Sequence, residues 1–115
     1  MKKVFVIGRI SDSSHVQFLR NIRAGIITSA RLLRAGFNVS CPFLDYQYIL
    51  AEDESIPLET LRAICLDEVR RADLILAIKG WERSPNCCIE VVTAENLGMR
   101  VYKDVETLIE NESTC

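Results

Sequence analysis

A single glutamate, Glu90, lies within the most apolar stretch of this chain, shortly after a polar turn at 80–86. The stretch at 87–94 covers more than two helical turns, at about 3.6 residues per turn. A helix that is apolar on nearly every side is typically buried and leaves little solvated surface for a charge. We therefore expect Glu90 to point into a cleft near the start of this helix, where the backbone dipole favours an anion. That position suits a nucleophile or an orienting base.

The turn before this helix has the features of an anion site. Ser84 followed by Pro85 is typical of a helix start, with serine as the N-cap and proline at the first helical position. The Ser84 hydroxyl and the amides of the helix N-terminus can also bind a phosphate. The two interpretations are compatible and both stay open. Arg9 and Ser11, which follow the first apolar run, are candidates to complete a phosphate site, although no Walker or dinucleotide-binding loop surrounds them.

Other reactive side chains give less specific indications. Trp81 is a candidate to stack on a flat base or to cover the edge of a sheet, and the sequence does not separate these two roles. The single histidine, His15, does not compose a Ser-His-Asp or Cys-His arrangement. Thiol chemistry at Cys87 or Cys88 ranks below carboxylate chemistry at Glu90, although a helix N-terminus lowers the pKa of a thiol.

Length and composition restrict the class of protein. With 115 residues, 49% hydrophobic and 26% charged, we expect one domain over 1–115. A net charge of −2 argues against nucleic acid as a partner. No apolar run reaches the roughly 18 residues of a membrane span and no signal peptide is recognised, so we expect no membrane partner and a cytoplasmic location. Five cysteines without C-x-x-C spacing indicate reduced thiols, with no metal and no cofactor.

Strand-like and helix-like segments alternate along the chain. We expect strands at 3–8, 37–41, 72–78 and 100–102, helices at 17–35, 58–71, from 85 to about 98 and at 104–110, and an irregular segment at 43–57. Strict alternation predicts an α/β fold, a single-domain three-layer flavodoxin-like or Rossmann-like sandwich with a parallel sheet of four or five strands. Ligands bind such folds at the carboxyl ends of the strands. There we expect these residues to be neighbours: Gly8, Arg9, Asp45, Trp81, Ser84 and Glu90.

Several segments together resemble the nucleoside 2-deoxyribosyltransferase-like superfamily. They are Val-Phe-Val-Ile-Gly at 4–8, the helix from Asn21 to Gly36, Cys41-Pro42, and above all the block 71–84 with its Ala-Asp and Gly-Trp-Glu-Arg-Ser elements. The resemblance covers about residues 3–103. It is greatest to small bacterial and phage members, and it extends to nucleoside 5′-monophosphate N-glycosidases.

The resemblance implies a role for individual residues. Glu90 matches the nucleophile, which attacks the anomeric carbon and forms a glycosyl-enzyme ester, as in retaining glycosidases. Ser84, six residues earlier, matches the serine that contacts the phosphate in the monophosphate-hydrolysing branch. Three features differ from the family pattern. Asn86 and Cys88 lie where small residues are usual, and Cys65 lies where a ribose-orienting aspartate is common. The turn after the first strand is Gly8-Arg9-Ile10 in place of a glycine-rich or glycine-proline turn.

Three functions follow, in order of preference. The first is cleavage of the N-glycosidic bond of a nucleoside 5′-monophosphate or related nucleotide, by hydrolysis or by sugar transfer. Glu90 would be catalytic there, and the expected substrate-binding residues are Gly8, Arg9, Ser11, Asp45, Trp81, Ser84 and Asn86. The second is a non-catalytic nucleotide-binding protein that uses the same pocket as a sensor or for sequestration. The third is a structural domain in which Glu90 is only paired internally. The resemblance also implies a homo-oligomer, a dimer or larger.

Overall fold

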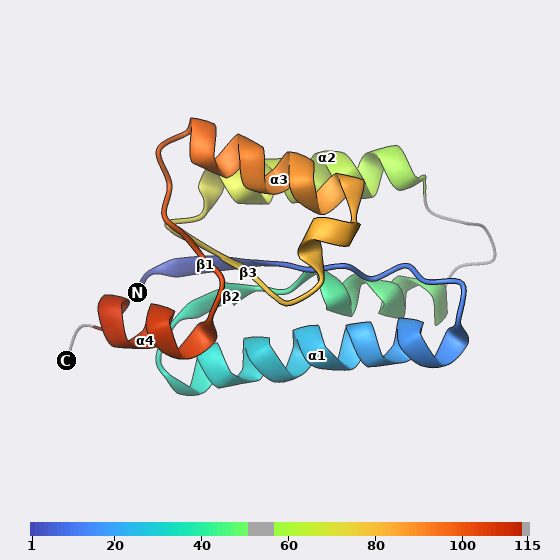
Figure 1. The fold of residues 1–115 in the computed structure, drawn as a ribbon, viewed down its shortest axis with the longest axis horizontal. Coiled ribbons are helices and arrows are strands. Elements are labelled where there is room, and N and C mark those ends of the chain that lie inside the picture. The colour runs from blue at the N-terminus through green and yellow to red at the C-terminus, as the bar shows by residue number, and fades with distance from the viewer. Residues whose placement is uncertain (51–56, 114–115) are drawn as a thin grey trace.

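Four short strands form one parallel sheet at the centre of the molecule. A computed structural model describes residues 1–50 and 57–113 (Figure 1). The strands are β1 (Lys3–Ile7), β2 (Asn38–Ser40), β3 (Leu74–Ala77) and β4 (Val101–Tyr102), in the order β2-β1-β3-β4. The predicted α/β class with a parallel sheet is confirmed, with four strands. All four residues of β3 are buried, as expected for a strand covered on both faces.

Strand β1 is the centre of the sheet and is fixed on both sides. Its residue Phe5 pairs in register with Ser40 of β2 and with Ile75 of β3. At the start of the strands, the backbone N–H of Lys3 donates to Asp73 Oδ2 at 2.8 Å, and the N–H of Asp73 donates to the Lys3 carbonyl at the same distance. Asp73 therefore has the structural role of a residue at a strand start.

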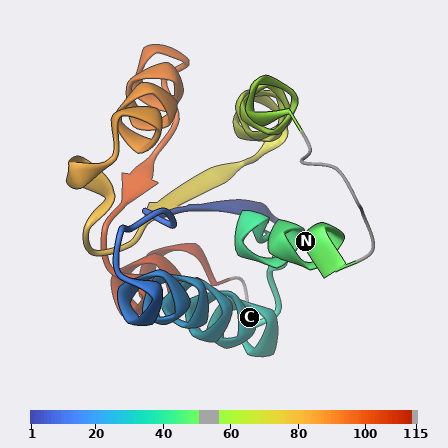
Figure 2. The same cartoon turned by 90° about the vertical axis from the view of Figure 1, so that its right-hand side faces the viewer.

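Helices cover both faces of the sheet. Helices α2 (Leu58–Arg71) and α3 (Pro85–Asn96) lie over one face, and α1 (His15–Arg34) and α4 (Val105–Glu112) lie over the other (Figures 1 and 2). The sheet separates two hydrophobic clusters accordingly. One contains Leu32, Phe43 and Leu108 beneath the sheet, and the other contains Val69, Val91 and Ala94 above it. This is the three-layer sandwich that the sequence predicts.

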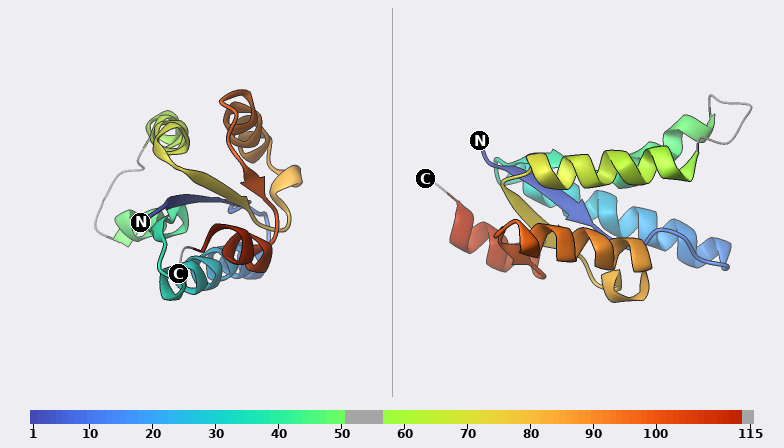
Figure 3. Two further views of the ribbon diagram at one scale, coloured as in Figure 1. Left: turned by 90° about the vertical axis from the view of Figure 1, so that its left-hand side faces the viewer. Right: turned by 90° about the horizontal axis from the view of Figure 1, so that it is seen from above.

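The first two crossover connections run in opposite directions along the sheet, which creates a switch point between β1 and β3. The connection from β1 through α1 leads to β2, and the connection from β2 through α2 crosses back past β1 to β3. The carboxyl ends of the strands and the N-terminal ends of α1, α2 and α3 lie at the same end of the molecule (Figures 1 and 3). Ligands of such folds bind at this edge.

Helix ends are set by local sequence. Ser14 caps α1 and Gly36 follows its end with φ of 94°, a left-handed conformation that glycine adopts without strain. Ser84 caps α3 and Pro85 is its first residue, as predicted. Gly98, with φ of 76°, ends the same helix.

Two expectations about local structure are wrong. The segment predicted to be irregular contains a 3-10 helix, η1 (Pro42–Leu50), in which Pro42 supplies the fixed φ of a first turn; residues 51–56 lie outside the described part. The helix that bears Glu90 is not buried on every side, because Ile89 and Val92 are 54% and 53% exposed. Helix α3 lies beside α2 as an outer layer, so only one of its faces meets the sheet.

Among residues 1–50 and 57–113, no helix is both long enough and apolar enough to cross a membrane.

Candidate functional site

The carboxyl edge of the sheet is closely packed at the end of β1. Phe43 of η1 and Ile78, which follows β3, lie against Gly8. A Cβ atom at Gly8 would lie 2.6 Å from a side-chain carbon of Ile78 and 2.7 Å from the Phe43 ring. Gly8 is therefore required by packing, which lets η1 approach the ends of β1 and β3. A direct contact of Gly8 with a ligand stays a prediction.

Glu90 lies in the second turn of α3 and is half-buried. Within the described part of the chain, its carboxylate has neither a hydrogen bond nor an ion pair. Burial raises the pKa of Glu90 from 4.5 to about 7. Desolvation thus outweighs the stabilisation that the helix N-terminus gives to an anion. The protein holds a carboxyl group that ionises near neutral pH, which suits proton transfer or nucleophilic attack.

Cys65 of α2 lies close to Glu90. It packs against the cluster that contains Cys87 and Val91, on the same face of the sheet as α3. Burial, followed by the negative charges of Glu90 and Asp45, raises the pKa of the Cys65 thiol to about 12. The thiol is therefore neutral at physiological pH and is not a nucleophile.

Asp45 of η1 approaches the same cysteine from a third element. The Asp45 side chain is half-buried, and its pKa is raised first by burial and then by the charge of Glu68. The charges of Asp45 and Glu90 both raise the pKa of Cys65, so both carboxyl groups lie within electrostatic reach of that thiol. The sequence predicts both residues at this edge, but it does not single out Glu68.

The start of α3 is organised around Ser84. Its Oγ accepts a hydrogen bond from the Cys87 N–H at 3.3 Å, which is the predicted cap. Asn86 faces Arg62 of α2. With the amide oxygen of Asn86 turned towards α2, it accepts from Arg62 Nε at 3.1 Å and from Nη2 at 3.3 Å. Arg62 is a cation at this edge that the sequence does not single out, because it lies in the middle of a helix-like segment, ten residues before the strand-like run at 72–78.

Arg9 and Ser11 do not form a preorganised phosphate site. The guanidinium of Arg9 donates from Nε to the Ser11 carbonyl at 3.3 Å, and its Nη2 pairs with Asp12 Oδ2 at 3.2 Å. The Ser11 side chain is exposed. The Arg9 charge is therefore already balanced within its own loop, and a phosphate would have to compete with Asp12 for it.

Trp81 covers the end of β3. It follows Gly80 in η2 (Trp81–Arg83), is half-buried, and packs against the cluster around Cys87. The ammonium group of Lys103 lies 5.3 Å from its ring centroid, a cation–π geometry. With the indole packed against the core and facing a lysine, this arrangement favours the covering role of Trp81 over base stacking.

Burial also keeps the Cys87 thiol neutral. Cys41, Cys65, Cys87 and Cys88 are free. Burial raises the pKa of Cys87 to about 11 despite its place at a helix N-terminus. In the described ranges, no group of three or more His, Cys, Asp or Glu residues is placed to hold a metal ion.

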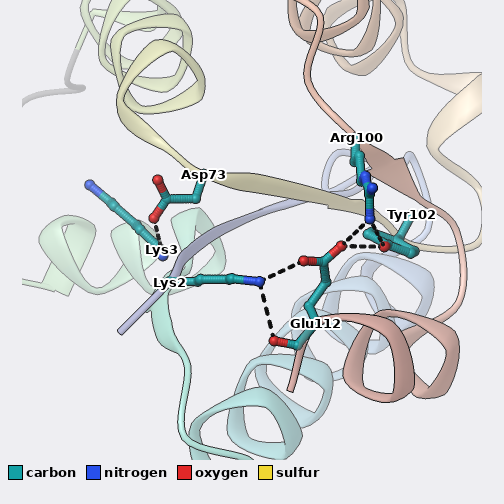
Figure 4. Close-up of polar contacts among 6 residues, drawn as sticks. All are labelled: Lys2, Lys3, Asp73, Arg100, Tyr102 and Glu112. Carbon is teal, nitrogen blue, oxygen red and sulfur yellow. Dashed lines mark hydrogen bonds and ion pairs between the residues drawn. The ribbon is translucent and has the colours of Figure 1, made fainter. Parts of the chain in front are cut away.

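The amino edge of the sheet carries a different charged cluster (Figure 4). Glu112, at the end of α4, is 7% exposed, and its carboxylate pairs with Lys2 Nζ at 2.8 Å and with Arg100 Nη1 at 2.9 Å. The Tyr102 hydroxyl also donates to it. The Lys2 hydrogen bond, followed by that of Tyr102, lowers the Glu112 pKa to about 2. The cluster attaches α4 to the sheet.

A hollow of about 520 Å³ adjoins this cluster. Its lining includes Lys2, Asp73, Arg100 and Glu112. It lies at the opposite edge from Glu90, so it is not the cleft that the sequence predicts at the carboxyl ends of the strands. Its acidic groups are committed to structural contacts, Asp73 to β1 and Glu112 to the pairs described above.

No model of a known protein family matches the chain, and a search of curated proteins finds no match. The chemistry of the site must therefore be derived from the chain's own residues.

Proposed function

We propose that this protein cleaves the N-glycosidic bond of a nucleoside 5′-monophosphate or a related nucleotide, with Glu90 as the nucleophile. The proposal is carried by one observation: Glu90, at the carboxyl edge of the sheet, is a half-buried carboxyl group without a partner among the described residues, and burial raises its pKa to about 7. The residue pattern that resembles the nucleoside 2-deoxyribosyltransferase-like superfamily supports the same role.

The reaction follows a double displacement. A Glu90 carboxylate oxygen attacks the anomeric carbon, the bond from that carbon to the base breaks, and the bonding electron pair leaves with the base, which takes up a proton. Water or a second base then attacks the anomeric carbon of the ester and returns the electron pair to Glu90. Because attack requires the ionised form, the rate of base release should rise as the pH passes about 7.

The nucleotide would be oriented by its phosphate. The Ser84 hydroxyl and the N-terminal amides of α3 would contact the phosphate, and Arg62 adds positive charge beside Asn86. Arg9 and Ser11 would join only if the Arg9 side chain exchanged Asp12 for the phosphate. Asp45 would contact the sugar or the base.

Chromatography of wild-type protein incubated with ribo- and deoxyribonucleoside 5′-monophosphates, and with the matching nucleosides, tests this proposal. We expect free base with the monophosphates for the wild type and none for Glu90→Gln, a neutral residue of the same shape. Glu95→Gln is the matched control, since Glu95 is exposed on the same helix. Base release by Glu90→Gln at the wild-type rate would rule out the nucleophile.

A non-catalytic nucleotide-binding protein is the second candidate. It is favoured by Cys65, whose neutral thiol lies beside Glu90 where an aspartate would orient a ribose in the family that the chain resembles. Isothermal titration with the same monophosphates, followed by recovery of the ligand, separates the two functions. Tight binding with intact ligand after long incubation would favour binding alone, and turnover gained by Cys65→Asp would identify the residue responsible.

We also propose that the protein is a homo-oligomer. Helix α1 exposes a set of large apolar side chains, namely Val16, Leu19, Ile27 and Leu33. Exposed apolar area of this kind is typical of an interface. Light scattering on purified protein should give a mass of at least twice 13.0 kDa, and Leu19→Glu should reduce it.

We also propose that the protein is cytoplasmic. The four described cysteines are free, as expected in a reducing compartment. Fractionation of the producing cells should recover the protein with the cytosol, and recovery with secreted proteins would contradict the proposal.

A further inference from the structure

The hollow at the amino edge of the sheet lies where three neighbouring strands begin. In the register of the sheet, Val4 of β1 pairs with Leu74 of β3, and Ile75 of β3 pairs with Val101 of β4. Residues at these strand starts, from three distant parts of the sequence, line one space of about 520 Å³. This volume is within the range of small-molecule sites, about 300–1,000 Å³. Buried Leu74 and half-buried Met99 give the lining an apolar part.

One side of the hollow carries a surplus of positive charge. Lys2 and Arg100 share a single carboxylate, that of Glu112, which is 7% exposed. Within residues 1–50 and 57–113, every hydrogen bond of the Arg100 side chain comes from Nη1, to Glu112 and to the Tyr102 hydroxyl. Glu112 thus holds the guanidinium in place while its Nε and Nη2 have no partner among these residues. These two nitrogens donate in parallel, the geometry that binds a carboxylate through both of its oxygens.

The other side of the hollow carries a negative charge. Asp73 is exposed, and its Oδ2 accepts a hydrogen bond from the Lys3 N–H at 2.8 Å. In the described part of the chain, its Oδ1 accepts no hydrogen bond and no cation pairs with the carboxylate. Figure 4 shows Asp73 apart from the cluster of Lys2, Arg100 and Glu112. The hollow therefore presents opposite charges at two separate places, with apolar surface in its lining.

We propose that this hollow binds a small zwitterion, an amino acid whose carboxylate contacts Arg100 and whose ammonium group contacts Asp73. An anion without the ammonium group would meet the charge of Asp73, and a cation without the carboxylate would meet the surplus charge of Lys2 and Arg100; like charges brought together in this way oppose binding. An apolar side chain of the amino acid would contact the apolar part of the lining. The site is independent of the proposed N-glycosidic cleavage, because it lies at the opposite edge of the sheet from Glu90.

NMR titration of the isotope-labelled full chain with L-leucine tests the proposal, since leucine has both charged groups and an apolar side chain. We expect saturable shifts of the backbone amides of residues 73–74 and 99–100, and none at Glu90. N-acetyl-L-leucine lacks the ammonium charge and L-leucinamide lacks the carboxylate. Each should bind at least about tenfold more weakly, because one charge-assisted contact is lost.

The separation of the two contacts is measured by β-alanine and γ-aminobutyrate, in which the ammonium group lies farther from the carboxylate than in leucine. The zwitterion whose length matches the separation of Asp73 and Arg100 should bind most tightly. No saturable shift with leucine or with either of these two amino acids would overturn the site. N-acetyl-L-leucine that binds as tightly as leucine would overturn the zwitterion as the class of ligand.

Two variants change the charge or the geometry of the hollow and retain its structural contacts. Asp73→Asn keeps an oxygen for the Lys3 N–H and removes the negative charge, and Arg100→Lys keeps a cation beside Glu112 and removes the parallel donors. Each should lower the affinity for the best zwitterion at least about tenfold. Asp73→Asn should also abolish the preference for leucine over N-acetyl-L-leucine, which a merely structural role of Asp73 would leave in place.

Glu95→Gln and Arg83→Lys are the matched controls, since both residues are exposed and neither lines the hollow. They should bind the zwitterion as the wild type does. Unchanged binding by both variants of the hollow would overturn the site, and so would an equal loss of binding in the controls. Because the ligand series is measured on the wild type, a variant that fails to fold leaves the test of the ligand class intact.

Discussion

Two glutamates at opposite edges of the sheet are withdrawn from water, and the protein surrounds them differently. Glu112, at the amino edge, has two cations and a hydroxyl within hydrogen-bonding distance, and its pKa is lowered to about 2. Glu90, at the carboxyl edge, has no such partner among the described residues, and its pKa is raised to about 7. The fold therefore stabilises the ionised form of Glu112 and destabilises the ionised form of Glu90.

The difference shows how the partners of a carboxylate decide whether the fold stabilises its ionised form. A carboxylate that is paired with cations and hydrogen-bond donors adds to stability, and these contacts lower its basicity. A carboxyl group left without partners lowers stability whenever it is ionised, and such groups occur mainly where their reactivity is used. Glu112 is the more buried of the two, yet its pKa is lowered, because its contacts outweigh the cost of removing its charge from water.

The largest expected effect on stability is that of Glu90→Gln. The pKa of Glu90 is higher in the folded protein than in the unfolded chain, so its favourable contribution is complete below about pH 4.5 and is lost as the pH rises through about 7. A rise from 4.5 to about 7 corresponds to about 3 kcal/mol. Urea unfolding should therefore find Glu90→Gln more stable than the wild type by up to that amount at pH 8, and equal to it at pH 4. Parallel stability curves would mean that Glu90 is not desolvated.

Glu112→Gln should have the opposite sign. It removes the charge that Lys2 and Arg100 share, and we expect a loss of about 2 kcal/mol at pH 7, reduced from a fully buried pair because both cations reach solvent. The pKa of Glu112 is lowered on folding, so this stability is present above about pH 4.5 and is lost as the pH falls through about 2. The comparison is again urea unfolding against pH.

Glu110→Gln is the control for this second variant, since Glu110 lies on the same helix and is exposed. It should leave the free energy of unfolding unchanged within about 0.5 kcal/mol. A similar loss in both variants would indicate a general effect of charge on α4, rather than the contacts of Glu112.

Cys65→Asp would make the environment of Glu90 still less favourable to an anion. A second negative charge beside Glu90 should raise its pKa above about 7, by roughly one pH unit. Carbon NMR of the side-chain carboxyl group measures this titration directly. Cys65→Ser, which adds no charge, should leave the pKa where it is. A Glu90 pKa that is equal in the two variants would place Cys65 outside electrostatic reach of Glu90.

Most of the fold follows from local patterns in the sequence. The apolar run at 72–78 predicts a strand buried on both faces, and Ser84-Pro85 predicts the start of α3, because both depend on neighbouring residues only. The exposed face of α3 was not predictable in this way. Ile89 and Val92 are as apolar as core residues, and only the packing of α3 beside α2 decides that they reach solvent.

The candidate site was predictable in part. Its location at the carboxyl edge and the candidacy of Glu90 and Asp45 follow from topology and residue type. The positions of the Arg62 and Glu68 side chains do not, because each depends on contacts between elements distant in sequence, Arg62 with Asn86 and Glu68 with Lys3. Arg9 was placed correctly in the loop after β1, but its pairing with Asp12 depends on the conformation of that loop.

A third carboxylate, Glu106, gives the smallest effect and completes the comparison. It is paired with Arg31 by two hydrogen bonds of 3.0 and 3.1 Å, yet its side chain is 55% exposed. Exposed ion pairs contribute little because solvent already stabilises both charges, so Glu106→Gln should cost at most about 0.5 kcal/mol in urea unfolding and less in high salt. A loss as large as that of Glu112→Gln would show that pairing alone determines the contribution of a carboxylate in this protein. A small loss would mean that a carboxylate must be both paired and buried to stabilise the fold, a condition that Glu112 meets and that Glu90, without a partner among the described residues, does not.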